Sequence, residues 1–303
     1  GRLNRPLQAF YPAALTHWAG HQKGGVRQPF ENESGRPNGE QIKTPLVKRL
    51  ESWAVRVTRD DAAPRIVFLV GGPGNGKTDA MEGCIGALNE ALGEDSKLMD
   101  GFKRAFEIGL GQIPPRKVTV EPLGARSSAL SLIHSVTLVQ DATEPDPAQP
   151  NKLAEELLLD DLLEVLTAQS GDIYLCCVNR GILSNAARIS QEDPQYSDLA
   201  QIITSVTESV TSKSTSTGCW PLESDNRIAI WPMDLESLVE SSEKGEADSV
   251  AYEIFRGLLN DEKWKETCVA GERCPFCTNK RLLSKPSNLD GLIWLLKSYE
   301  LVA

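Results

Sequence analysis

The chain has 303 residues, 42 of them acidic and 32 basic, so its formal net charge at pH 7 is −10, and 40% of its residues are hydrophobic. This length suffices for about two globular domains, and the negative balance argues against a surface built throughout for nucleic-acid backbone, although a local basic groove is compatible with it. Because no apolar run reaches the ~20 residues that span a bilayer and no signal-peptide pattern opens the chain, we expect a cytoplasmic protein with no membrane partner.

Residues 1–43 are rich in Gly, Pro, Asn and Gln, a composition that favours an irregular N-terminal arm. The sequence begins with Gly and stops in an apolar run, so we expect it to be part of a longer protein. From Thr44 onward apolar residues recur at helical intervals, and Thr44 followed by Pro45 makes a good N-cap and first turn. The first regular helix is therefore predicted to begin here.

Strand-like apolar runs alternate with helical patterns between residues 44 and 234. We expect strands at 65–70, 116–123, 134–144, 172–179 and 226–234, and helices at 77–92, at 151–169 and after 179. This alternation predicts an α/β domain with a parallel sheet in three layers. Residues 235–303 are largely helical in pattern, so a helical lid or C-terminal segment is expected to follow the α/β domain.

The segment after the first strand carries the full G-x-x-x-x-G-K-[ST] pattern of a phosphate-binding loop, or P-loop. It consists of Gly71, Gly72, Pro73, Gly74, Asn75, Gly76, Lys77 and Thr78, with Asp79 next in the following helix. Glycines let successive backbone N–H groups surround phosphate oxygens, and the helix N-terminus adds partial positive charge. We expect Lys77 to contact the β- and γ-phosphates of a nucleotide and the Thr78 hydroxyl to ligate Mg²⁺.

Magnesium and the attacking water need a carboxylate opposite this loop, at the end of a neighbouring strand. Asp141 follows the third apolar run, with Ala142 next and Glu144 as the following acid. Two catalytic roles of Asp141 stay open. Asp141 is either the magnesium residue, with Glu144 or another acid activating water, or it is itself the water-activating group. A third interpretation is that Asp141 only caps a turn.

Asn179 stands just beyond the fourth apolar run, where its amide can reach a γ-phosphate or the lytic water, although Asn-Arg-Gly is also a good turn sequence. The order of glycine loop, acidic strand and asparagine strand resembles the AAA+ ATPases over about residues 44–240. The resemblance implies that Asn179 is the sensor-1 residue and that Arg180, Arg188 or Arg227 is an arginine finger. Arg227 is nearest to the position where the resemblance would put the finger. The chain departs from this family at Asp141, because the family pattern has Asp-Glu there.

This resemblance implies a Mg-dependent ATP-hydrolysing switch or motor subunit that works as a homo-oligomer or in a multi-subunit complex. The strings "GGPGNGKT", "NRG" and "CPFCTNK" also resemble large ATPases of bacterial defence and restriction islands, such as the family tied to DNA phosphorothioation-dependent restriction. That resemblance implies antiviral defence and DNA as a partner. A non-hydrolysing nucleotide-gated scaffold and a phosphotransferase stay open as alternatives, and ATP rather than GTP rests on the resemblance alone.

The segment around Cys268, Cys274 and Cys277 has the spacing C-x₅-C-x₂-C, and its C-P-x-C part resembles a zinc knuckle. A closed zinc site needs four ligands. We expect the fourth to be Cys219, by folding back, or a residue outside this sequence. Free structural thiols and a redox pair are the alternatives.

The remaining thiols and the histidines indicate no catalytic metal. Cys84, Cys176 and Cys177 lie in apolar contexts and are expected to be buried in the core. The histidines, at positions 17, 21 and 134, are scattered, and none flanks the cysteine cluster.

Overall fold

The computed structural model describes residues 30, 41–72, 74–107, 115–123, 132–168, 171–211, 219–240, 249–264, 268 and 270–300. The chain divides into two compact units, one spanning Leu46–Glu236 and the other combining Gly1–Pro45 with Ser237–Ala303. We call them the sheet unit and the C-terminal unit. The sequence suggested boundaries at residues 44 and 234, and most of the arm predicted for residues 1–43 lies outside the described residues.

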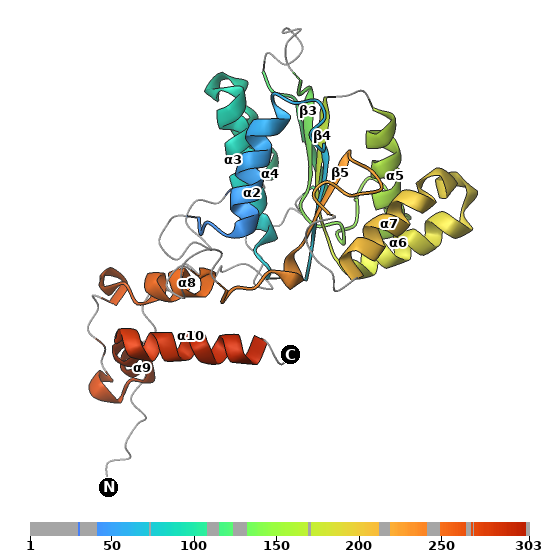
Figure 1. Ribbon diagram of the computed structural model, residues 1–303. Coiled ribbons are helices and arrows are strands. Elements are labelled where there is room, and N and C mark those ends of the chain that lie inside the picture. The colour runs from blue at the N-terminus through green and yellow to red at the C-terminus, as the bar shows by residue number, and fades with distance from the viewer. Residues whose placement is uncertain are drawn as a thin grey trace. The chain divides into compact units, whose positions relative to one another are not determined.

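A five-stranded sheet with the order β2-β3-β4-β1-β5 forms the centre of the sheet unit (Figure 1). Its strands are β1 (Ile66–Val70), β2 (Lys117–Val120), β3 (Ser135–Val139), β4 (Asp172–Val178) and β5 (Ile228–Pro232). Strands β3, β4, β1 and β5 pair in parallel, as the alternating pattern predicts.

The expectation of a wholly parallel sheet is wrong for β2, which pairs with β3 in the antiparallel direction. In β2 exposed and buried residues alternate at first, with Lys117 and Thr119 exposed and Val118 buried. Such alternation is typical of an antiparallel edge strand with one solvated face, whereas all five residues of the central strand β1 are buried. The sheet is therefore mixed, with its antiparallel member at one edge.

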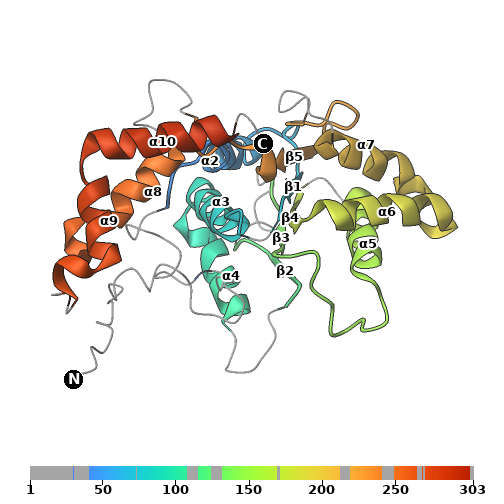
Figure 2. The ribbon, with the colours of Figure 1, turned by 90° about the horizontal axis from the view of Figure 1, so that it is seen from below.

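Helices cover both faces of this sheet, which gives the expected three layers (Figures 1 and 2). One face carries α2 (Pro45–Val57), α3 (Lys77–Leu92) and α4 (Leu98–Phe106), and the other carries α5 (Ala154–Thr167), α6 (Arg180–Glu192) and α7 (Ala200–Thr211). Short 3₁₀ turns occur at η2 (Glu94–Ser96), η3 (Pro194–Leu199) and η4 (Met233–Leu235). Helix α3 begins and ends at the predicted residues.

A buried charged group ties the edge strand to the second helical layer. Asp161 of α5 is only 5% exposed, and its Oδ2 lies 2.7 Å from Nη1 of Arg116, which is equally buried. The Tyr174 hydroxyl donates to the same oxygen over 3.1 Å, and the Lys117 ammonium lies 2.9 Å from Oδ1. Because three donors satisfy one buried carboxylate, the position of β2 is fixed relative to β4 and α5.

The C-terminal unit is helical, as its pattern predicts. It contains α8 (Val250–Leu258), η6 (Asp261–Trp264), η7 (Gly271–Arg273), α9 (Pro275–Leu283) and α10 (Pro286–Glu300), and α10 packs against α8 and α9 (Figure 2). Its apolar core is small and is formed by Val239, Ala251, Leu289 and Ile293. Within the described residues, none of the helices in either unit has the length and apolar character needed to cross a membrane.

We predict that Asp161→Ala lowers the free energy of unfolding by about 3 kcal/mol or more, because it leaves the Arg116 charge buried and unpaired. Urea denaturation followed by circular dichroism measures this loss. The matched control is Glu164→Ala on the same helix, since Glu164 is 72% exposed in its pair with Lys117 and should cost no more than about 1 kcal/mol. Equal losses from the two substitutions would contradict the prediction.

Candidate functional site

The register of the central strands brings three chain segments to the same level at the carboxyl edge of the sheet. Val70 of β1 is paired with Val178 of β4 on one side and with Pro232 of β5 on the other. The glycine loop, Asn179 and the turn η4 therefore begin side by side. In parallel α/β sheets this edge is where ligands bind.

The third predicted component reaches the same edge through β3. Val139 of β3 is paired with Cys176, and beyond the strand the Ala142 N–H donates to the Cys177 carbonyl over 2.9 Å. Asp141 thus follows the end of β3, while β4 lies between β3 and β1. The ends of β3 and β1 are two strand spacings apart, roughly 9–10 Å.

The conformation of the glycine loop explains why its glycines are needed. Gly74 and Gly76 have φ angles of 84° and 79°, which residues with a side chain adopt only with strain. A β-carbon on Gly71 would lie 2.7 Å from Asp234 Oδ1 and 2.8 Å from Asn75 Nδ2, so any side chain there would have to displace one of these groups. Pro73 lies outside the described residues.

The N-terminus of α3 begins without a side-chain cap. Gly76 occupies its N-cap position in the left-handed conformation and, having no side chain, provides no side-chain cap for the first turn. Unsatisfied N–H groups and the helix dipole at such an end favour an anion. The residues present therefore fit a phosphate group.

Lys77, at the first position of α3, folds back onto the loop. Its Nζ donates to the carbonyl oxygens of Gly71 over 2.8 Å and of Gly72 over 2.5 Å. The half-buried Thr78 comes next, and its hydroxyl makes no hydrogen bond to another residue within the described part of the chain. Asp79 follows within the first turn of α3.

Asp141 closes a tight turn after β3. Its Oδ1 accepts hydrogen bonds from the backbone N–H of Thr143 over 2.9 Å and from the Thr143 hydroxyl over 2.7 Å. This is the turn-capping geometry that the sequence left open, and it occupies one oxygen of the carboxylate. Glu144 is exposed, and its backbone N–H donates to the Asp141 carbonyl.

Cys177 of β4 links Lys77 and Asp141 electrostatically. Burial raises the pKa of its thiol well above the ordinary value, the Lys77 charge lowers it and the Asp141 charge raises it. The strand ends that precede the two residues, those of β1 and β3, lie at the same edge of the sheet with β4 between them.

Asn179 caps α6. Its Oδ1 accepts a hydrogen bond from the Ile182 N–H over 2.9 Å. Because the oxygen is used in this way, the amide nitrogen, a donor only, is left for other partners. The cap therefore holds the side chain by its oxygen and leaves its donor end for an acceptor.

Asp234 is a component of this edge that sequence reasoning treated only as a domain boundary. Its Oδ1 accepts from Asn75 Nδ2 over 3.0 Å, and its Oδ2 lies 3.1 Å from Arg180 Nε. One carboxylate thus joins the glycine loop, the start of α6 and the end of β5. Its position directly after an apolar strand, like that of Asp141 and Asn179, was the signal that could have identified it.

Arg227 is not brought to the glycine loop of its own chain. It precedes β5, and its carbonyl accepts from the N–H groups of Arg65 and Ile66 at the start of β1, the opposite edge of the sheet. Its guanidinium donates to Asp225 through both Nε and Nη2. A role in a neighbouring chain stays a prediction.

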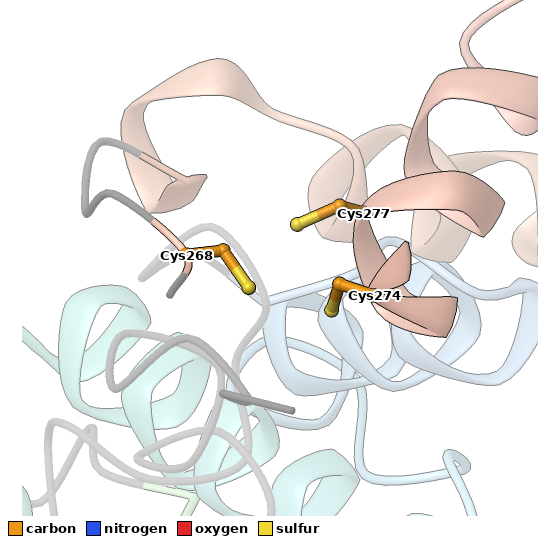
Figure 3. A group of neighbouring side chains, drawn as sticks. All are labelled: Cys268, Cys274 and Cys277. Carbon is orange, nitrogen blue, oxygen red and sulfur yellow. The ribbon is translucent and has the colours of Figure 1, made fainter. Parts of the chain in front are cut away.

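Three cysteines of the C-terminal unit form a metal-compatible group (Figure 3). The Sγ atoms of Cys268, Cys274 and Cys277 all lie within 4.8 Å of one another. Cys274 is buried at the N-cap of α9, Cys277 lies in the first turn of that helix, and Cys268 comes from the preceding segment. Burial, together with hydrogen bonds between the Cys277 thiol and the other two cysteines, raises the pKa of Cys277 to about 11.

Cys219 does not belong to this group. It is buried in the core of the sheet unit, where its Sγ donates to the Ser209 carbonyl over 3.9 Å. The earlier expectation of Cys219 as a fourth metal ligand therefore receives no support from the arrangement of the thiols. Cys84, Cys176 and Cys177 are buried, as the sequence predicts.

We predict that Gly71→Ala lowers the free energy of unfolding by about 1–2 kcal/mol, because the new β-carbon must displace Asp234 or Asn75 and break their hydrogen bond. The matched control is Gly72→Ala, since nothing lies within 4 Å of a β-carbon at that position. Thermal unfolding of the two variants beside the wild type measures the difference. An unchanged stability of Gly71→Ala would show that the close approach of Asp234 is not maintained.

Comparisons of the chain with protein-family models, with curated proteins and with solved structures found no match.

Proposed function

We propose that the sheet unit binds Mg-ATP and hydrolyses it, and that the chain is an ATP-driven switch or motor subunit. The observation that carries this proposal is the glycine loop, which follows a central parallel strand, has left-handed glycines and leads into an uncapped helix N-terminus. Backbone donors arranged in this way suit the phosphates of a nucleotide.

Each predicted side chain has a distinct task in this proposal. Lys77 exchanges the carbonyls of Gly71 and Gly72 for the β- and γ-phosphates, and Thr78 holds the magnesium ion. The magnesium ion would neutralise part of the phosphate charge. Asn179 donates to the γ-phosphate through its amide nitrogen, while its oxygen keeps capping α6.

Asp141 is the acidic partner on the far side of β4. Its Oδ1 is held by Thr143, which fixes the carboxylate and leaves Oδ2 to accept from magnesium-bound or attacking water. The width of β4 between the two components leaves room for a γ-phosphate and a water molecule. Glu144, two residues beyond Ala142, is the alternative water-activating acid.

A second candidate is a nucleotide-gated scaffold that binds ATP without hydrolysing it. The turn at Asp141 favours this candidate, because a carboxylate engaged in a local turn is less able to act as a base. The lack of an Asp-Glu pair at the end of β3 also favours the scaffold. A phosphotransferase is less favoured, since the sequence carries no acceptor-site motif.

The partners belong to the proposal as well. We infer that the chain assembles as a homo-oligomer or within a multi-subunit complex, with Arg227 as the residue offered to a neighbour's nucleotide. DNA as a partner, antiviral defence and a cytoplasmic location rest on the resemblance and composition described above.

We further infer that Cys268, Cys274 and Cys277 bind a structural zinc ion. Thiolates around a tetrahedral zinc lie about 3.8 Å apart, given Zn–S bonds of ~2.3 Å, and the sulfur atoms here are close enough to adopt that spacing. Two of the ligands lie at the start of α9 and the third lies in the segment before it, so the ion would tie that segment to the helix. The fourth ligand lies outside this group of three.

We predict that the purified chain releases phosphate from Mg-ATP, that Lys77→Ala abolishes both binding and release, and that Asp141→Ala binds ATP but loses roughly 100-fold or more in rate. The exposed Lys103→Ala is the control for removing a lysine from this unit. Binding without release by the wild type would favour the scaffold, and equal behaviour of Lys77→Ala and Lys103→Ala would contradict nucleotide binding at this loop. Stimulation by duplex DNA would identify the partner class.

Asn179→Asp separates the cap of α6 from the phosphate contact in the same assay. The substituted carboxylate still accepts from Ile182, so the thermal stability should stay close to that of the wild type. The donor is lost, however, and the new charge repels phosphate, so the rate should fall at least about tenfold. An unchanged rate would exclude the sensor role.

We predict that the chain contains about one zinc ion per molecule and that Cys274→Ser loses it and unfolds at lower temperature, because binding energy of the metal is folding energy. Cys84→Ala, a buried thiol outside the group, is the control and should keep the metal. Elemental analysis and a zinc-chelator release assay measure the content. Full zinc content in Cys274→Ser would show that this group is not the site.

A further inference from the structure

Arg180 is a charged side chain beside the glycine loop to which the proposed hydrolysis assigns no role. It is the first residue of α6, directly after Asn179, and its side chain is 36% exposed. A positive charge at a helix N-terminus opposes the helix dipole. Its place there therefore needs a compensating partner, and Asp234 provides one.

The contact between Arg180 and Asp234 is incomplete. Nε of Arg180 lies 3.1 Å from Asp234 Oδ2, yet this buried N–H is not aligned with the oxygen and has no hydrogen-bond partner among the described residues. The Nη groups make no hydrogen bond to the described part of the chain either. One edge of the guanidinium thus faces the carboxylate, and the other is available to an acceptor.

Asp234 also connects Arg180 to the glycine loop of the same chain. Its second oxygen accepts from Asn75, and the absence of a side chain on Gly71 allows this approach. A carboxylate beside a phosphate site would repel the ligand unless a cation offset it. Arginine suits that position, because its planar fork can meet a carboxylate on one edge and a phosphate on another.

The other two arginines considered as fingers are already engaged. Arg188 pairs with Glu192 on the outer part of α6, and Arg227 pairs with Asp225 at the opposite edge of the sheet. Arg180 is the one of the three that stands beside the loop of its own chain.

We propose that Arg180 binds the terminal phosphate of the nucleotide held by its own chain, and that Asp234 is the residue that positions it. This inference rests on the proposed nucleotide binding at the glycine loop. It makes Arg180 a ligand within the chain rather than a finger for a neighbour, and it makes the Arg180–Asp234–Asn75 group sensitive to the presence of a γ-phosphate.

Isothermal titration calorimetry with Mg-ATP and Mg-ADP tests the proposal on the full chain. Arg180→Ala should weaken Mg-ATP binding at least about tenfold, as expected for loss of charge-assisted hydrogen bonds, and change Mg-ADP binding little. Arg188→Ala, on the same helix, should change neither. Asp234→Asn keeps an acceptor for Asn75 but loses the charge, so it should reduce the preference for ATP over ADP without lowering the thermal stability as Gly71→Ala does.

Mixing two variants distinguishes an Arg180 that acts within its own chain from one that acts on a neighbour's nucleotide. Hydrolysis should not recover when Arg180→Ala chains are mixed with Lys77→Ala chains, because each chain lacks part of its own site. Recovery in the mixture would overturn the proposal in favour of a finger acting on a neighbour, and equal losses for ATP and ADP would overturn it in favour of a structural role.

A failure of the proposed nucleotide binding gives a different result from a failure of the Arg180 proposal alone. A wild-type chain that binds neither nucleotide, or a Lys77→Ala chain that binds both unchanged, would overturn nucleotide binding at the loop and this inference with it. Binding of ATP without hydrolysis leaves the calorimetric comparison as the deciding test.

Discussion

The parallel pairing of β1 between β4 and β5 is the constraint on which the candidate site depends. Val70 of β1 is paired with Val178 of β4 and with Pro232 of β5, so the three strands end at the same level of the sheet. All of β1 is buried, and β-strands buried on both faces cannot slip by one residue without turning every side chain to the other face. The positions of the loop, Asn179 and Asp234 follow from this register rather than from their own contacts.

Charged groups at this edge have partners within the protein. Lys77 donates to loop carbonyls, Asp141 accepts from Thr143, and Asp234 lies between Asn75 and Arg180. The partners of Lys77 are neutral carbonyls, so a phosphate can take over its contacts without leaving a buried charge unpaired, while Arg180 can keep Asp234 on one edge and meet the phosphate on another. Ligand binding would then be an exchange of partners, which couples the three segments to the occupancy of the site.

The cysteines show how burial and grouping give one residue type two different roles. In β4, burial raises the pKa of Cys176 to about 12 and prevents it from becoming a nucleophile or a metal ligand at neutral pH. The three thiols around α9 also have a raised pKa at Cys277, but part of the cause is the closeness of the other thiols. A metal ion would reverse that effect, because it stabilises thiolates that would otherwise repel one another.

Much of this architecture could be predicted from the sequence because its signals are local. The glycine loop is a run of consecutive residues, α3 follows it directly, and the apolar runs of β1, β3, β4 and β5 are contiguous. The acid and the asparagine were found because each follows such a run. Even the cysteine group needs only a short bend of the chain.

What the tertiary structure alone decided involves residues that are distant along the chain. The antiparallel direction of β2 and the place of Cys219 in the core of the sheet unit both escaped the local pattern. Asp234 meets Asn75 across 159 positions, and that meeting requires β5 to lie next to β1. The sequence by itself determined which segments form strands, helices and a phosphate loop, because those depend on neighbouring residues. Strand order and register decided which side chains share an edge, because those depend on how the buried faces pack together.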